Sequence, residues 1–124
     1  MSVKKTTKKS SISTQAAKAK GRRLQQWVRD KILEVFPSLH PDDVKSTGMG
    51  QVGEDVQLSP AARKLIPVSI ECKARAKVPY IYDWYSQAEA NCPVGSEPVL
   101  VIRQDRKKAL VVIDADTYFK EKSK

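Results

Sequence analysis

The chain has 124 residues, 40% of them hydrophobic, which suits one soluble domain with a short tail. No apolar run reaches the roughly 20 residues that span a bilayer, and the basic N-terminus lacks the apolar stretch of a secretory signal. Two cysteines and one histidine exclude a disulfide framework, a Cys/His zinc site and mechanisms that need two histidines. We therefore expect a protein that stays in the cytoplasm of the cell that makes it.

The positive charge is concentrated at the N-terminus. The net charge is +9, and no acidic residue precedes Asp30. Eight cations in this stretch supply most of the excess: Lys4, Lys5, Lys8, Lys9, Lys18, Lys20, Arg22 and Arg23. Such an arm favours a polyanionic partner, and nucleic acid is favoured over a membrane surface because the arm has no apolar face. The alternative is a solvated tail that only aids solubility.

The first segments in chain order are this arm and a helix. Residues 1–14 are rich in Lys, Ser and Thr and are expected to be disordered. We place the domain boundary so that residues 1–18 form the arm and residues 19–120 the folded domain. Apolar side chains recur every three or four positions over residues 15–36, which predicts a helix. Trp27 lies on this apolar stripe and is expected in the core.

Short strands and two further helices are predicted after this helix. The strands are expected at residues 43–47, 54–58, 68–73, 98–103 and 109–113, and the helices at residues 81–91 and 114–119. The last two strands are strongly apolar, so both are expected to be central in the sheet or well covered. The order α-β-β-β-α-β-β-α predicts an α/β fold, a mixed sheet flanked by helices.

A glycine-rich segment matches a nucleotide-binding pattern. Residues 48–53 have the spacing of the dinucleotide-binding fingerprint, G-x-G-x-x-G. That motif works where a strand precedes it and a helix follows it, whereas here a strand is predicted after Gly53. We therefore expect no nucleotide cofactor and interpret the segment as a turn.

Two acidic residues and a lysine are expected to meet on the sheet. Glu71 and Lys73 are two positions apart on one strand and so project from the same face. Antiparallel pairing with the preceding strand would place Asp55 beside Glu71. Two carboxylates can hold a divalent metal, and a lysine can steady a water or a phosphate oxygen. For Glu71 and Lys73 alone, the alternative is a surface ion pair.

Three segments together resemble the PD-(D/E)xK nuclease superfamily. They are Gly53–Val56, Ser69–Lys73 and a following helix that carries Gln87. The helix start at Lys20–Arg23 is similar to that of Holliday-junction resolvases and related small phage endonucleases. The resemblance spans residues 19–119 and implies a restriction-endonuclease-like fold. It also implies a homodimer, since resolvases cut two strands symmetrically, and it fits a phage or mobile-element origin.

The resemblance implies a role for individual residues. Asp55 and Glu71 would bind Mg²⁺ (or Mn²⁺), with the backbone carbonyl of Cys72 as a third donor. Lys73 would position the attacking water, and Gln87 would support the site. The implied activity is that of a metal-dependent DNA endonuclease that is selective for DNA structure.

The chain departs from the family pattern at two positions. Glu54 replaces the proline of the family's name and could be the metal ligand in place of Asp55. Gln25 stands where resolvases usually have a metal-binding glutamate, so a second metal is less expected. Because Gln25 adds no charge, a catalytically weak or inactive DNA-binding module of the same fold is the alternative function. Ser69 is a further supporting candidate.

The remaining candidates are residues for DNA binding. They are Lys18, Lys20, Arg22, Arg23, Arg75, Lys77 and Tyr80. The cations would contact phosphates, and Tyr80 is evenly balanced between packing and DNA contact.

Overall fold

The computed structural model describes residues 2–47 and 53–124, with side chains from residue 15 onward. Its elements are α1 (Ser2–Val35), η1 (Pro41–Asp43), β1 (Val44–Ser46), β2 (Val56–Leu58), α2 (Pro60–Leu65), β3 (Val68–Arg75), α3 (Ile81–Ala90), β4 (Glu97–Gln104), β5 (Leu110–Val112) and α4 (Ala115–Lys122). The short helices η1 and α2 are additions to the predicted order. Although α1 has 34 residues, no helix in the described ranges is both long and apolar enough to cross a membrane.

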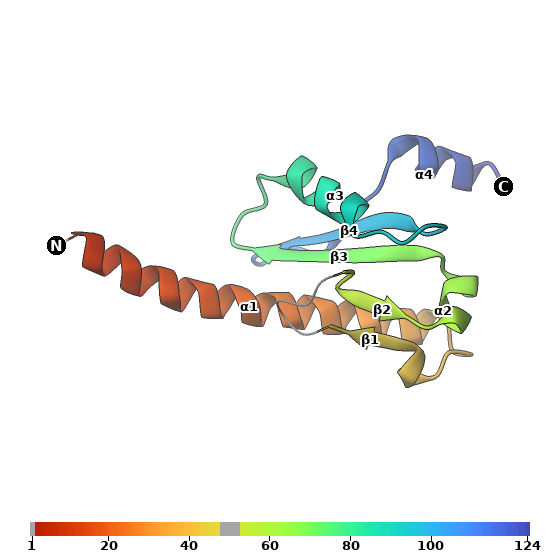
Figure 1. Cartoon of the computed structure of the whole chain (residues 1–124), viewed down its shortest axis with the longest axis horizontal. Helices are drawn as coiled ribbons and strands as arrows, with labels where there is room; N and C mark the ends of the chain where they lie inside the picture. The colour runs from red at the N-terminus through yellow and green to blue at the C-terminus, as the bar shows by residue number, and fades with distance from the viewer. Residues whose placement is uncertain (1, 48–52) are drawn as a thin grey trace.

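The five strands form one sheet in the order β1-β2-β3-β4-β5. β3 and β4 are parallel, because α3 crosses over between them, and the other neighbouring strands are antiparallel. The sheet lies between α1 on one face and α3 on the other (Figure 1). The predicted α/β class, a mixed sheet flanked by helices, is therefore confirmed.

The main core lies between α1 and the sheet. Leu24, Val28 and Ile32 of α1 are buried against alternate residues of β3. In β3 these residues are Ile70, Cys72 and Ala74. Because successive side chains of a strand point to opposite faces, Ser69, Glu71 and Lys73 belong to the other face, on which α3 lies. The packing of α1 thus determines which residues of β3 remain for chemistry.

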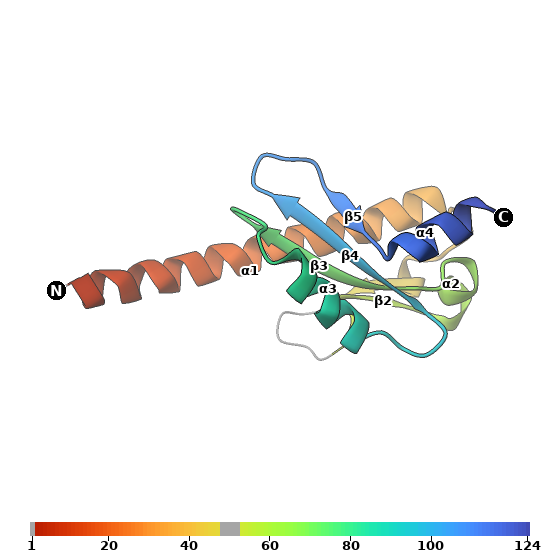
Figure 2. The same cartoon turned by 90° about the horizontal axis from the view of Figure 1, so that it is seen from above.

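The structure differs from the sequence prediction at both ends of the chain. α1 begins at Ser2, where a disordered arm was expected, and its N-terminal half extends past the sheet (Figures 1 and 2). The division into an arm of residues 1–18 and a domain of residues 19–120 stays a prediction. The C-terminal helix α4 continues to Lys122, beyond its predicted end at Phe119.

Two predictions of burial are wrong. Trp27 was expected in the core, but half of its surface is exposed. Both C-terminal strands were expected to be covered, yet only β4 is buried, through Leu100, Val101 and Ile102. β5 forms an edge of the sheet, and its residues Leu110 and Val111 are exposed. Apolar composition predicts a strand, whereas covering depends on which neighbours the strand finds.

Candidate metal and nucleic-acid site

Asp55 lies where β2 and β3 separate. The only paired residues of these two strands are Val56 and Ile70. The backbone nitrogen of Asp55 donates to the carbonyl of Ile70 at 2.9 Å. Two residues after Ile70 on β3, the backbone nitrogen of Cys72 donates to Oδ2 of Asp55 at 2.6 Å. The carboxylate therefore occupies the position on β3 that a continued β2 would have filled.

Glu71 and Lys73 lie beside this carboxylate. Glu71 is only 5% exposed, and its carboxyl group is close enough to that of Asp55 for the charge of Asp55 to raise its pKa. The Nζ atom of Lys73 lies 3.7 Å from Oε1 of Glu71, and the Lys73 side chain is largely buried. The carboxylate just before β2 and the two side chains of β3 thus come to one place on the α3 side of the sheet.

Burial changes the acidity of both carboxyl groups. The pKa of Asp55 is raised by desolvation, which outweighs the opposing effects of the Cys72 N–H and of Lys73. The pKa of Glu71 is raised by desolvation and then by the nearby charge of Asp55. Two desolvated carboxyl groups side by side are unfavourable as anions, and one lysine compensates only part of the cost. A divalent cation between them would remove this cost.

A backbone oxygen is available at the same place. The N–H and C=O of a strand residue point to the same side of the strand. Since the N–H of Cys72 points toward Asp55, its carbonyl faces that side too, beyond the last β2 pairing. Three oxygen donors suit a hard cation such as Mg²⁺ or Mn²⁺. Within residues 2–47 and 53–124, no three Asp, Glu, His or Cys side chains gather as a metal site.

Glu54 points to a different partner. Its buried carboxylate forms an ion pair with Arg63 of α2. Arg63 also donates to the carbonyl of Val68 and to Oγ of Ser96, both at 3.2 Å. These contacts join α2 to the start of β3, and they hold Glu54 in a structural role. Of the two adjacent acids, Asp55 is the one beside Glu71.

The contact from α3 comes from a residue that the sequence analysis missed. Gln87, the predicted supporting residue, is exposed on α3. Asn91, which ends the helix, donates through Nδ2 to Oε2 of Glu71 at 3.5 Å. Residues four apart share one face of a helix, so the spacing from Gln87 was a usable signal for Asn91. Arg63 had no comparable signal, because it lies in α2, nine residues after its partner Glu54 and outside the quoted motifs.

The other two supporting candidates are buried. Gln25 is 3% exposed on the core face of α1, and its Oε1 has no hydrogen-bond partner among the described residues. No described contact joins Gln25 to the two carboxylates. Ser69 is also buried, on the same face of β3 as Glu71 and two residues before it. Both residues keep their supporting roles as predictions.

The predicted DNA-binding residues fall into two groups. Lys20 and Arg23 border a cavity together with arginines that sequence reasoning did not select, described below. Lys18 and Arg22 lie elsewhere on α1, and Arg75 ends β3 and is followed by Lys77 and Tyr80. Tyr80 is exposed and packs edge-on against Trp84. Residues 48–52 of the glycine motif lie outside the described residues, so the turn predicted there stays a prediction.

No protein-family model matches the chain, and neither the search of curated proteins nor that of solved structures returned a match.

Proposed function

We propose that this protein is a metal-dependent DNA endonuclease of the PD-(D/E)xK type, with a restriction-endonuclease-like sheet. The observation that carries the proposal is the grouping of Asp55, Glu71 and Lys73 at the point where β2 leaves β3. Three unusual features coincide there: two desolvated carboxyl groups close together, a largely buried lysine side chain, and a strand carbonyl that has no partner among the described residues. Stability alone gives no reason to bury these groups together, whereas phosphodiester hydrolysis needs each of them.

Each residue has a role in this proposal. Asp55, Glu71 and the Cys72 carbonyl would hold Mg²⁺ or Mn²⁺. The ion, when bound, would polarise the phosphate and make a water molecule more acidic. Lys73 would donate hydrogen bonds to a phosphate oxygen and to the attacking water, and so stabilise negative charge as it develops. Asn91 would hold the Glu71 carboxylate in its orientation.

The proposed substrate is DNA, with branched structures such as Holliday junctions preferred and DNA recombination as the setting. Support comes from the net charge of +9 and from the basic residues of α1, several of which are exposed. A homodimer would place two sites on the two strands that a resolvase cuts. The proposed compartment is the cytoplasm, in keeping with the resemblance to phage endonucleases.

One observation favours a second candidate, a DNA-binding module without activity. Gln25 is neutral and buried, where the resemblance calls for a carboxylate. If α1 must supply a charged ligand, then the metal affinity of this chain would be too low for cutting.

Cutting of labelled four-way junctions and linear duplexes, with and without Mg²⁺, tests the proposal. Wild-type protein should cut only with the metal, and Glu71→Gln or Lys73→Met should lower the rate about a hundredfold or more. Glu34→Gln and Lys64→Met, at exposed positions on α1 and α2, are the charge-matched controls. Tight DNA binding without cutting by the wild type would favour the inactive module instead.

A further inference from the structure

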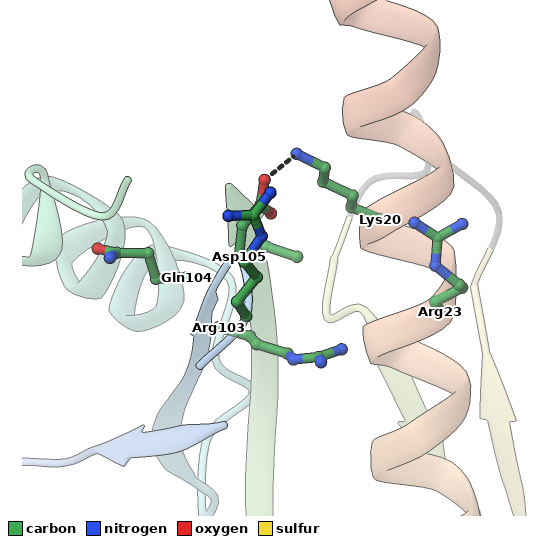
Figure 3. Close-up of a pocket in the computed structure, with 7 residues that line it drawn as sticks. Lys20, Arg23, Arg103, Gln104 and Asp105 are labelled. Atoms are coloured by element: carbon green, nitrogen blue, oxygen red, sulfur yellow. Dashed lines mark hydrogen bonds and ion pairs between the residues drawn. The ribbon is translucent and has the colours of Figure 1, made fainter. Parts of the chain in front are cut away.

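A cavity of about 330 Å³ opens between α1 and the end of β4 (Figure 3). Seven residues line it: Lys20, Arg23, Ala74, Arg103, Gln104, Asp105 and Arg106. Four of these are cations and one is an acid, so the walls carry a clear excess of positive charge. The cations come from α1, from β4 and from the turn after β4, and Figure 3 shows Lys20 and Arg23 on α1 facing Arg103 and Asp105.

The single carboxylate does not neutralise this set. Oδ2 of Asp105 pairs with Nζ of Lys20 at 2.7 Å. Nε of Arg103 donates to the carbonyl of Lys107 at 3.0 Å, which leaves its other donors available. In the described part of the chain, no ion pair includes Arg23, Arg103 or Arg106. Several like charges around one opening repel one another, and an anion from solution would relieve this repulsion.

Arg106 adds a second, independent sign of function. Its φ angle is 65°, in the left-handed region that glycine or asparagine usually occupies. The turn that contains it is closed by the hydrogen bond from Lys107 N to Gln104 O at 2.9 Å. Arginine is unfavourable in this backbone conformation, so its presence at position 106 indicates that the guanidinium group has a function.

The position of the cavity relates it to the proposed site. Ala74 follows Lys73 on β3 and lies opposite Arg103 on β4. Successive side chains point to opposite faces, so the cavity is on the α1 side and the carboxylates are on the α3 side. A phosphate in the cavity would therefore not be the phosphate that is cut. A long polyanion that passes this end of β3 could contact both the cavity and the proposed site.

We infer that this cavity binds a backbone phosphate of DNA, away from the phosphate that is cut. The inference rests on the proposed function only in naming DNA as the partner. Guanidinium groups match phosphate oxygens in shape and charge, and three arginines border the cavity. Asp105 acts as an internal competitor, because its bond to Lys20 must loosen when the phosphate enters.

Binding of a fluorescent DNA duplex in EDTA, where no metal-dependent cutting occurs, tests the inference. The variant Arg23→Ala/Arg106→Gly should weaken binding about tenfold or more at low salt and reduce the salt slope by about one to two. Glycine at position 106 keeps the left-handed backbone. The control Lys45→Ala/Lys64→Ala removes two exposed cations outside the cavity and should have a much smaller effect. Equal effects of the two pairs would overturn the inference.

A second variant tests the internal competitor. Asp105→Asn should tighten DNA binding several-fold, more than Asp116→Asn, which removes one exposed acid from α4. Equal effects of the two would show that only net charge matters, and would count against a role of Asp105 in the cavity.

Two further readouts separate this inference from other possibilities. If a mononucleotide or inorganic phosphate saturates the cavity while the double variant binds DNA normally, the site serves a small anion and the inference fails. If the variant binds DNA normally and metal-dependent cutting is observed, the cavity proposal fails and the nuclease proposal stands. Weakened binding by the variant in a protein that never cuts DNA would leave the cavity proposal standing alone.

Discussion

Oδ2 of Asp55 lies 2.6 Å from the backbone nitrogen of Cys72, so this carboxylate takes the place of a missing strand partner. The neighbouring acid, Glu54, pairs with Arg63 instead. The two adjacent carboxylates therefore have different roles: Asp55 lies where β2 and β3 separate, and Glu54 belongs to a structural ion pair. Their substitutions should differ in kind.

Asp55→Asn should lower the rate of metal-dependent cutting about a hundredfold or more, because it removes a charged ligand at the proposed site. Glu54→Gln should instead lower the free energy of unfolding by about 2–4 kcal/mol, because it leaves Arg63 partly buried without its anion. Urea unfolding and cutting rates, measured on both variants, check this. The double variant Glu54→Gln/Arg63→Met should recover part of the lost stability, and a stable but inactive Glu54→Gln would reverse the assignment.

The contact between Asp55 and Glu71 predicts a pH effect on stability without metal. Both pKa values are raised in the folded protein above their ordinary values of 3.8 and 4.5. The folded state then binds protons more tightly than the unfolded state, so stability falls as the pH rises from about 4 through the folded pKa values. Glu71→Gln should therefore raise the Tm at neutral pH in EDTA and flatten its dependence on pH.

Mg²⁺ provides the matched control for this effect. It should raise the Tm of the wild type at neutral pH by binding the folded state, and should raise that of Glu71→Gln much less. A Glu71→Gln variant less stable than wild type in EDTA would show that the pair is not strained.

Asn91→Ala should lower the cutting rate about tenfold to a hundredfold, because Glu71 loses the amide that orients it. DNA binding in EDTA should not change, and a higher Mg²⁺ concentration should restore part of the activity. Gln87→Ala, on the same helix and at an exposed position, is the matched control. A larger loss for Gln87→Ala would return the supporting role to the residue that the sequence predicted.

Ser59 joins two short helices and should matter for stability alone. Its Oγ accepts from the backbone nitrogen of Ala62 at 3.1 Å, as the N-cap of α2, and donates to Oδ1 of Asp43 at 2.7 Å. Ser59→Ala should cost about 1–2 kcal/mol through the lost cap. The pKa of Asp43 is lowered by the Ser59 hydroxyl and then by the His40 N–H. Its contribution to stability is therefore present above pH 3.8 and is lost as the pH falls through the folded pKa.

Acid unfolding followed by fluorescence checks this prediction. Ser59→Ala should show a weaker loss of stability at acid pH than the wild type, and Ser38→Ala, at an exposed loop position, should behave as the wild type.

The exposed apolar side chains beside β5 predict where a homodimer would form. Trp27, Leu110 and Val111 border one apolar surface cavity of about 300 Å³. β5 is an edge strand, and its free edge can pair with that of a second copy about a two-fold axis. Leu110→Lys should shift a dimer to a monomer in sedimentation experiments, whereas Val94→Lys, at another exposed apolar position, should not. A dimer unchanged by Leu110→Lys would place the interface elsewhere.

The local sequence determined most of the elements and the spacing of the site residues. Periodicity predicted a helix over residues 15–36, and alternation in β3 placed Glu71 and Lys73 on one face, because both signals depend on neighbours within a few positions. The apolar stripe of α1 also predicted most of its buried face, although Trp27 and Val35 are exposed. The sequence also indicated the register between β2 and β3 in part, since only one pairing of these strands brings Asp55 beside Glu71.

Tertiary structure decided the rest, because long-range partners leave no local pattern. Only the packed chain distinguishes Asp55 from Glu54, since the choice depends on Arg63, which reaches Glu54 from α2. The same holds for Asn91 at Glu71, for the exposure of β5 at the sheet edge, and for the four cations that three separate segments bring to one cavity. A side chain's type is written in the sequence, but its burial and its charge partners follow from which distant segments pack against it.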